Sequence, residues 1–286
     1  MANTKVSKPA SPARKGTTPS GVGVVLGGDN RARVATSTNT PSRWIGQIES
    51  RWPDDSITIG TGTLIDDHHV LTCAHNFYDT KKEVSCTAAA FTPALNRNSA
   101  GNLQSPYNSY ELRGWSVPDL YKKTGGPPPP PAGVAWTEVT NYLYDYAVGT
   151  LTKAVSDPPG ESLLSPSWPG DDQISTLACT INGYSGDLDH TANTQYTRSG
   201  GVALDNSHEF VMYTMSTYHG DSGAPVFFQP PQRNYWTIIA IHVTGVPDSA
   251  PGAGDGRNFG PAMTSAALEW VQGALAGVSR LGAIRP

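Results

Sequence analysis

The stretch ITIGTGTLIDDHHVLT, residues 57–72, decides the fold of this chain. Its first part, 57–65, is rich in Ile and Thr with glycines between them, a composition that favours a β-strand. Asp66 and Asp67 are typical turn residues, and the apolar run 69–72 follows them. The stretch therefore predicts a β-hairpin and a fold built from antiparallel strands.

Similar strand signals recur on both sides of this hairpin. Alternating or β-branched runs bounded by turn-forming residues lie at residues 43–49, 144–151, 174–181, 210–214, 225–228 and 236–243. A helical pattern occurs near the end, where Leu268, Val271 and Leu275 share one face. Thr264 or Ser265 can cap the amino end of this helix. The prediction is an all-β fold followed by one C-terminal α-helix.

The charge and composition exclude several classes of partner. The 286 residues carry 20 Lys and Arg against 24 Asp and Glu, which gives a net charge of −4. This balance provides no cationic field for phosphates, so we expect no nucleic acid partner. No run approaches the roughly 18 consecutive apolar residues that cross a bilayer, so we expect a soluble protein without a membrane contact.

Three segments rich in turn-forming residues divide the chain. Residues 1–23 place Lys and Arg among Ser, Thr, Pro and Gly but lack the apolar region of a secretory signal, and we expect a disordered leader. The five prolines at 127–131 cannot donate to a β-ladder and predict an exposed loop, with a ligand for a proline-binding module as the alternative. Residues 156–170 lie between two β-rich halves and are interpreted as a linker.

The cysteines and histidines indicate no metal site. Cys73, Cys86 and Cys179 are too few for a disulfide scaffold and lack the spacing of a zinc site. Cys73 and Cys86 are the plausible disulfide pair by sequence separation, and three buried thiols are the alternative. His68 and His69 are adjacent strand residues that point to opposite faces, and a turn explains the aspartates before them. We therefore expect no metal and no cofactor.

The strongest chemical signal is GDSGAPV at residues 220–226. Glycines on both sides of Ser222 allow a tight turn that presents the hydroxyl outward while backbone N–H groups converge on one point. The motif predicts a nucleophile together with an oxyanion hole formed by the N–H groups of Gly220 and Ser222. An ordinary polar turn is the alternative, so the motif needs partners elsewhere in the chain.

His75 and Asp145 are the candidate partners. A serine hydroxyl becomes nucleophilic when a base accepts its proton and a third group orients the base. His75 follows the apolar run VLTCA at the end of a predicted strand. Asp145 is the single carboxylate in the apolar run YLYDYAV, a costly location unless its charge is hydrogen-bonded. With Ser222, these residues predict a triad that hydrolyses protein or peptide substrates through an acyl-enzyme.

The chain order His75, Asp145, Ser222 resembles that of the chymotrypsin-like serine proteases. Over roughly residues 24–276 the chain is most similar to the glutamyl endopeptidases of the staphylococcal V8 and Bacillus branch. The segments that carry this similarity are VLGGDNRARV (25–34), INGYSGD (181–187) and NFG (258–260). The resemblance implies two six-stranded antiparallel β-barrels packed side by side, at 24–155 and 171–262, followed by the helix and tail at 263–286. The triad would lie in the cleft between the barrels.

The resemblance also bears on the residue before the cleaved bond. Trypsin itself needs an aspartate six residues before the nucleophile, where this chain has Ser216, so cleavage after Lys or Arg is disfavoured. Thr217 and His242 match the carboxylate-binding positions of glutamyl endopeptidases, and Gly245 lies three residues after the histidine. An imidazole N–H and a hydroxyl in a partly desolvated pocket can hold a carboxylate. The resemblance implies cleavage after Glu, and more slowly after Asp.

One departure from the branch concerns activation. Asp221 precedes the nucleophile, where V8-type enzymes usually have Asn or Gln. In trypsin-type enzymes a liberated amino terminus pairs with this aspartate, whereas in V8-type enzymes it approaches the S1 pocket. Val24 or Val25 could do either, and in both cases we expect residues 1–23 to be an inhibitory leader.

The resemblance further implies a secreted monomer, although no secretory signal is recognisable. A protease with the same triad and another specificity is one alternative interpretation. A catalytically silent homologue that serves as a binding module is another.

Overall fold

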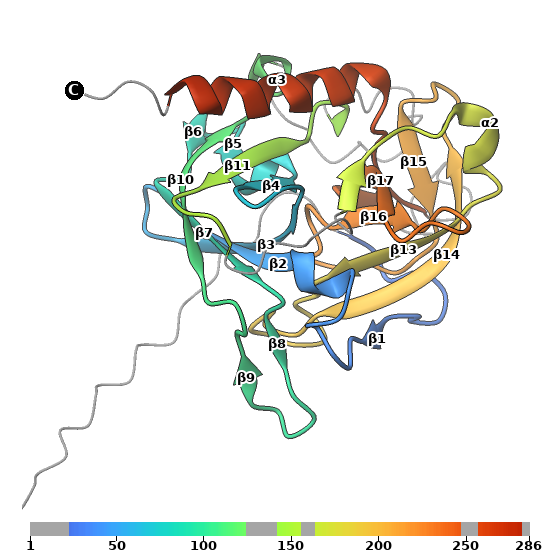
Figure 1. Ribbon diagram of the computed structural model, residues 1–286, viewed down its shortest axis with the longest axis horizontal. Helices are drawn as coiled ribbons and strands as arrows, with labels where there is room; N and C mark the ends of the chain where they lie inside the picture. The colour runs from blue at the N-terminus through green and yellow to red at the C-terminus, as the bar shows by residue number, and fades with distance from the viewer. Residues whose placement is uncertain (1–22, 124–141, 156–163, 247–256, 282–286) are drawn as a thin grey trace, which may run out of the picture.

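Strands form most of the regular structure in the computed structural model, which describes residues 23–123, 142–155, 164–246 and 257–281 (Figure 1). The strands of the first half are β2 (Ile45–Arg51), β3 (Ile57–Leu64), β4 (His69–Thr72), β5 (Tyr78–Asp79), β6 (Val84–Ser85), β7 (Ala88–Pro93), β8 (Asn96–Arg97), β9 (Leu103–Gln104), β10 (Tyr110–Ser116) and β11 (Ala147–Leu151). Those of the second half are β12 (Leu164–Pro166), β13 (Ala178–Gly183), β14 (Tyr196–Leu204), β15 (Phe210–Tyr213), β16 (Pro225–Phe228), β17 (Trp236–Ile241), β18 (Thr244–Val246) and β19 (Arg257–Pro261), joined by β1 (Ala32–Arg33). The α-helices are α1 (Asp119–Lys123), α2 (Asp171–Ile174) and α3 (Ser265–Leu281), and short 3₁₀ helices cover Ser42–Trp44 and Ala74–Asn76.

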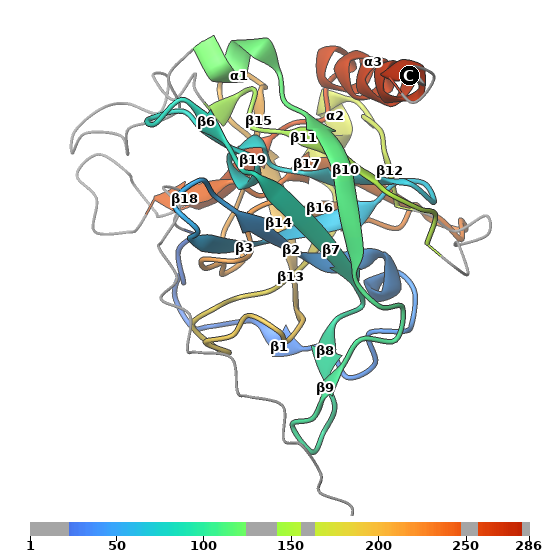
Figure 2. The same ribbon diagram turned by 90° about the vertical axis from the view of Figure 1, so that its left-hand side faces the viewer.

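The first half is a closed barrel with the strand order β10-β11-β4-β3-β2-β7. The predicted hairpin is confirmed, because β3 and β4 pair with Thr63 opposite Leu71. Asp66 closes its turn, since one carboxylate oxygen accepts hydrogen bonds from the backbone N–H groups of His68 and His69 at 2.8 and 2.7 Å. The β8–β9 hairpin projects from one end of this barrel (Figure 2).

The second half closes less regularly than a six-stranded barrel with continuous ladders. Its sheet has the order β12-β17-β16-β13-β14-β15-β19-β18, and β1 pairs with β14. An isolated antiparallel bridge between Ala240 and Ala262 joins β17 to the residue after β19 and completes the ring. Pro261, the last residue of β19, has no N–H group to donate, which limits the ladder at this closure. The architecture is thus trypsin-like, with one fully laddered barrel and one ring closed by a bridge.

The C-terminal helix is confirmed as α3, which lies along the first barrel beside β11 (Figure 1). Val271 is buried, and the rings of Trp270 and Tyr146 meet edge to face with centroids 5.1 Å apart. The chain of the second half thereby ends on the first half, which ties the two together. Among the described residues, no helix combines the length and apolar character needed to cross a membrane.

Three strand predictions begin too early. The segment 43–49 starts with the end of the 3₁₀ helix Ser42–Trp44, and strand β2 begins at Ile45. The segment 174–181 starts with the end of α2 and a loop, and strand β13 begins at Ala178, because Asp171 and Asp172 favour the amino end of a helix. Asp145 lies in a turn before β11 rather than in a strand, and its N–H donates to Tyr142 O at 3.1 Å. The prolines at 127–131, residues 1–22 and most of the predicted linker lie outside the described residues.

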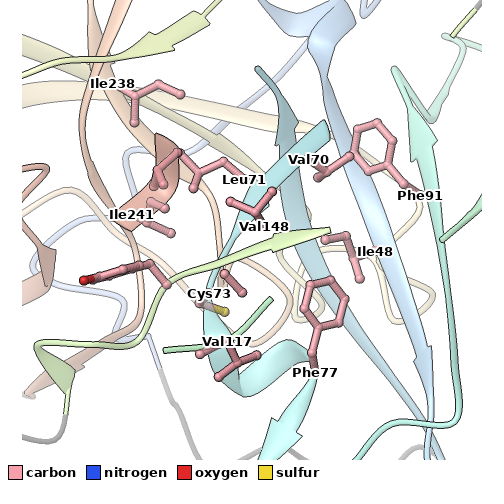
Figure 3. Packing of buried hydrophobic residues seen from close by; sticks show 14 of the residues in the cluster. Ile48, Val70, Leu71, Cys73, Phe77, Phe91, Val117, Val148, Ile238 and Ile241 are labelled. Atoms are coloured by element: carbon pink, nitrogen blue, oxygen red, sulfur yellow. The ribbon is translucent and has the colours of Figure 1, made fainter. Parts of the chain in front are cut away.

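The three cysteines are all free and buried, so of the two open interpretations that of three buried thiols is confirmed and Cys73 and Cys86 form no disulfide. Cys73 lies in the core of the first barrel, among Phe77, Val117 and Val148 (Figure 3). Burial raises the pKa of the thiols of Cys86 and Cys179 to about 12, so both behave as small apolar side chains.

Candidate active site

The loop around Ser222 requires glycine at two positions. Gly220 and Gly223 have φ values of +95° and +89°, in the region where other residues are strained. A Cβ atom on Gly220 would lie 2.2 Å from Tyr184 O, and one on Gly223 would lie 2.1 Å from Thr61 O. The GDSG motif therefore builds a sharp loop that is packed against both halves of the molecule, with Ser222 at its tip.

Two backbone N–H groups of this loop have no partner among the described residues. Asp221 N donates to Tyr218 O at 2.9 Å, and Gly223 N donates to His242 O at 2.8 Å. Within the described part of the chain, the N–H groups of Gly220 and Ser222 donate no hydrogen bond. These are the two groups that the sequence assigns to the oxyanion hole, and they are available to bind an anionic oxygen.

The first barrel holds this loop through side chains that sequence analysis missed. Thr61 Oγ1 donates to Gly220 O at 2.7 Å, and Thr61 N donates to Ser222 O at 2.8 Å. Asn76 Nδ2 also donates to Ser222 O, at 3.1 Å. These bonds fix the carbonyl oxygens of Gly220 and Ser222. The N–H groups of Gly220 and Ser222 therefore keep their direction. Asn76 directly follows His75, which places that histidine beside the loop.

His75 and Asp145 form a buried pair. Asp145 Oδ2 lies 2.7 Å from His75 Nδ1, and Asp145 Oδ1 accepts a hydrogen bond from the backbone N–H of His75 at 2.9 Å. Burial acts to lower the pKa of His75, but the Asp145 carboxylate and the Cys73 sulfur outweigh it and hold the pKa well above the ordinary 6.5. The carboxylate thus orients the imidazole and stabilises its protonated form, as a base in a triad requires.

The second nitrogen of His75 faces a cysteine in this structure. His75 Nε2 lies 3.4 Å from Cys73 Sγ. Within the described residues, Ser222 Oγ forms no hydrogen bond with His75. The structure therefore brings the three predicted triad residues to one place but leaves the serine and the histidine unlinked. In substrate-free enzymes such hydrogen bonds are often long and shorten when substrate binds.

The predicted pocket residue His242 lies next to the nucleophile loop. It exchanges backbone hydrogen bonds with this loop, receiving one from Gly223 N and donating one to Ala224 O, each at 2.8 Å. Its Nδ1 lies 2.8 Å from the hydroxyl of Tyr213, while its buried Nε2 has no partner. Burial, followed by the charges of Arg198 and His75, lowers the pKa of His242 well below 6.5, so this imidazole is neutral at neutral pH.

Thr217 and Gly245, the other two predicted pocket residues, meet at the amino-terminal segment. Thr217 N donates to Val24 O at 3.1 Å, and the buried Thr217 Oγ1 has no hydrogen-bond partner. A Cβ atom on Gly245 would lie 3.1 Å from Val24 Cγ2 and 2.0 Å from Asn258 Oδ1. Asn258 binds both sides of Val24, accepting from its N–H at 2.9 Å and donating to its carbonyl at 2.7 Å.

A second anchor holds the amino-terminal segment. The guanidinium of Arg31 donates to both carboxylate oxygens of Asp187 at 2.7 and 2.6 Å. This bidentate pair joins the sequence segments 25–34 and 181–187, two of the three that carry the family resemblance. The segment is thereby held along the same wall as Thr217, where Ser216 N donates to Asn30 Oδ1 at 3.0 Å.

Asp221 is paired with residues of the second half in this unprocessed chain. Its carboxylate is fully buried and lies 3.0 Å from Nη2 of Arg198, whose side chain is also inaccessible to solvent. Asp221 Oδ2 also accepts hydrogen bonds from Ser185 Oγ at 2.6 Å and from Tyr218 N at 2.9 Å. Sequence analysis missed Arg198; its only signal in the sequence is that it is the single charged residue of strand β14.

Comparison with known proteins adds to this geometry. Residues 60–230 match a family described as a trypsin-like peptidase domain. A glutamyl endopeptidase of Bacillus licheniformis is 30% identical over 239 residues, covering 82% of this chain and 65% of that protein. An extracellular metalloprotease of Bacillus subtilis is 26% identical over 258 residues, covering 87% of this chain and 68% of that protein. The chain thus spans about two thirds of the length of these relatives.

Solved structures agree with the fold. A structure of a Glu endopeptidase in complex with MPD superposes with a TM-score of 0.66 at 24% identity, covering 88% of this chain and 100% of that chain. The structure of the protease Anisep from Arthrobacter nicotinovorans superposes with a TM-score of 0.58 at 16% identity, covering 82% of this chain and 93% of that one.

The pKa of His75 should depend on Asp145. We expect an NMR titration to place the midpoint of His75 above 6.5 in the native protein and at a lower pH in Asp145→Asn, because the variant loses the negative charge that favours the imidazolium. Asp171→Asn removes an exposed carboxylate of the second half and should leave the midpoint unchanged. An unaltered midpoint in Asp145→Asn would show that the carboxylate does not act on this imidazole.

The Arg198–Asp221 pair should be needed for folding stability. Arg198→Met leaves a buried carboxylate without its cation and should lower the free energy of unfolding by roughly 3–5 kcal/mol. The double variant Arg198→Met/Asp221→Asn removes both charges and should recover part of this loss. Urea denaturation of the three proteins measures the difference. Equal losses in the single and double variants would contradict the pairing.

Proposed function

Because this chain belongs to the trypsin-like peptidase family, we propose that it is a serine endopeptidase that cleaves after Glu, and more slowly after Asp. The observation that carries the specificity is a pair of buried polar atoms without partners, His242 Nε2 and Thr217 Oγ1. Buried polar atoms are nearly always hydrogen-bonded, so two such atoms at predicted pocket positions favour a polar ligand group. The name of the Bacillus licheniformis relative, glutamyl endopeptidase, supports the same assignment.

The chemistry follows from the residues around Ser222. Its Oγ attacks the carbonyl carbon of the scissile peptide bond while His75 Nε2 accepts the hydroxyl proton. Asp145 holds the opposite nitrogen of the ring, and the N–H groups of Gly220 and Ser222 stabilise the oxyanion. The protonated histidine then gives its proton to the leaving amine. Water, deprotonated by the same histidine, hydrolyses the acyl-enzyme.

The hydrogen bonds of His242 decide which substrate group its free nitrogen can bind. Burial raises the pKa of the Tyr213 hydroxyl well above its ordinary value, so this hydroxyl keeps its proton. Its proton has one described acceptor, Nδ1 of His242, and we assign the hydrogen bond as donated by the tyrosine. The neutral imidazole then carries its proton on Nε2 and can donate it to a carboxylate. Two donors, this N–H and the Thr217 hydroxyl, offset the desolvation of a Glu side chain.

The amino-terminal segment supports an inhibitory role for residues 1–23. The backbone of Gly23 lies so close to Thr217 that a Cβ atom on this glycine would be 2.3 Å from Thr217 Oγ1. In the unprocessed chain, Gly23 therefore covers one of the two proposed carboxylate donors. Cleavage before Val24 would remove this cover and leave a free ammonium group where the Val24 nitrogen is held by Asn258.

The name of the Bacillus subtilis relative raises a metal-dependent mechanism as the competing assignment. In the part of the chain that the structure describes, the group of His, Cys, Asp and Glu residues close enough to hold a metal is Cys73, His75 and Asp145. Two of these belong to the proposed triad, which favours the serine mechanism. A serine enzyme keeps its activity in a chelator, so EDTA separates the two assignments.

Peptide-library cleavage by the processed protein tests the specificity. Wild type should cut after Glu, with Gln at the same position poorer by roughly 10⁴-fold, since the pocket is built for a carboxylate. Thr217→Val, which is nearly isosteric, and His242→Ala should each lower kcat/KM for Glu substrates, the latter by about 2–4 kcal/mol. Both variants should still react with a small organophosphorus reagent at Ser222.

Ser222→Ala is the matched control for the chemistry and should lose activity on the order of 10⁶-fold while the fold is retained. A preference of wild type for Phe, Leu or Arg, or undiminished Glu preference in His242→Ala, would overturn the specificity and leave the serine mechanism standing. Near-native turnover by Ser222→Ala would overturn the mechanism.

A chain that begins at Val24 should be far more active than the full chain beginning at Met1. The physical reason is the cover that Gly23 places on Thr217. Ser222→Ala in the full chain prevents self-processing, and mass spectrometry then shows whether the leader stays attached. Equal rates for the two wild-type chains, with the leader shown to be intact in the longer one, would contradict an inhibitory leader.

A further inference from the structure

Cys73 is a buried thiol that the proposed catalytic cycle does not use. It follows strand β4 directly and lies two residues before His75, with no exposed surface. Figure 3 shows its side chain among Phe77, Val117 and Val148, which offer no polar atoms. Its sulfur lies 3.4 Å from Nε2 of His75 and is also reached by the backbone N–H of Asn76. A soft sulfur thus touches the nitrogen that has to accept the serine proton.

The spacing of these two atoms suits a metal ion. Zinc binds thiolate sulfur at about 2.3 Å and imidazole nitrogen at about 2.0–2.1 Å, so two such ligands of a tetrahedral ion are about 3.5–3.6 Å apart. The distance of 3.4 Å between Cys73 Sγ and His75 Nε2 is close to this separation. Ligand atoms of Cys73, His75 and Asp145 all lie within 4.8 Å of one another.

The hydrogen bond from His75 to Asp145 also has the form found around bound metals. A histidine that ligates a metal through one nitrogen usually donates its other N–H to a carboxylate, which fixes the ring and raises its basicity. Asp145 Oδ2 accepts in this way from His75 Nδ1 at 2.7 Å. The carboxylate that orients the ring for proton transfer therefore also orients it as a ligand.

We propose that Cys73 and His75 form an inhibitory site for a thiophilic divalent cation such as Zn²⁺. On binding, the Cys73 thiol and the protonated Nε2 of His75 each release a proton to solvent; the sulfur then forms a metal–sulfur bond and the freed lone pair of Nε2 forms a metal–nitrogen bond. Water molecules complete the coordination, and no oxidation or reduction occurs. Of the two residues, His75 is the one with accessible surface, 8%. Because Nε2 is then occupied, it cannot accept the proton of Ser222.

This inference rests on the proposed role of His75 as the base. It also singles out one of the three thiols, since Cys86 and Cys179 belong to no metal-capable group among the described residues. Cys179 is as fully buried as Cys73 but packs in the core of the second half. Cys179→Ala is therefore the matched control for Cys73→Ala.

Inhibition by Zn²⁺ is measured on the processed protein, with each variant compared with its own metal-free rate. Wild type and Cys179→Ala should be inhibited, EDTA should restore their activity, and Mg²⁺ should have no effect because it prefers oxygen ligands. Cys73→Ala and the size-matched Cys73→Ser should need at least about tenfold more Zn²⁺ for half inhibition. Equal sensitivity of wild type and the Cys73 variants, or no inhibition of wild type, would overturn the proposal.

Direct binding separates this inference from the proposed function. Cd²⁺ added to Ser222→Ala protein should give the ultraviolet band of a sulfur–cadmium bond at one ion per chain, and the added Cys73→Ser change should abolish it. Absence of the band would overturn the site even if the enzyme proves to be a serine protease, because the measurement requires only a protein that retains Cys73. Binding through Cys73 without loss of wild-type activity would instead overturn the inhibition and the assignment of His75 as base.

Discussion

The buried carboxylate of Asp221 is the constraint on which the active-site loop depends. A charge without solvent must be compensated within the protein, and here Arg198, Ser185 and the N–H of Tyr218 do so. These contacts fix the residue directly before Ser222 and thereby the direction of the free N–H groups at Gly220 and Ser222. In trypsin-type enzymes a liberated amino terminus fills the place taken here by Arg198, so this chain orders its nucleophile loop with a residue that is present before any cleavage.

The loop is held equally from the other half of the molecule. Thr61 and Asn76 donate to the carbonyl oxygens of Gly220 and Ser222, so the first barrel holds the backbone of the loop whose Asp221 side chain is held by the second half. Asn76 immediately follows His75, and one short segment therefore positions both the proposed base and the loop that carries Ser222. The geometry around Ser222 is consequently a property of the contact between the halves, and α3, which packs against β11, joins the end of the second half to the first barrel.

Local sequence patterns predicted the elements but not their contacts. The hairpin at 57–72 and the C-terminal helix follow from periodicity and turn residues, which act over a few positions. Arg198, Thr61 and Asn76 escaped prediction because their partners lie 23, 159 and 146 residues away in sequence, and only the folded chain brings them together. Asp145 was predicted from its charge in an apolar run, although that reasoning placed it in a strand and the structure places it in a turn. A buried charge signals that a partner exists, but it does not say which residue the partner is.

The amino-terminal segment connects the proposed activation with the proposed specificity. Val24 is held by Asn258 and Thr217, and Arg31 fastens the same segment to Asp187. With Asp221 already neutralised by Arg198, a new amino terminus at Val24 has no carboxylate of the nucleophile loop left to pair with. Its positive charge would stay beside Thr217 and therefore act on the substrate side of the cleft. Cleavage would then change what the pocket binds and not whether the nucleophile loop is ordered, which is the opposite of the division of roles in trypsin-type enzymes.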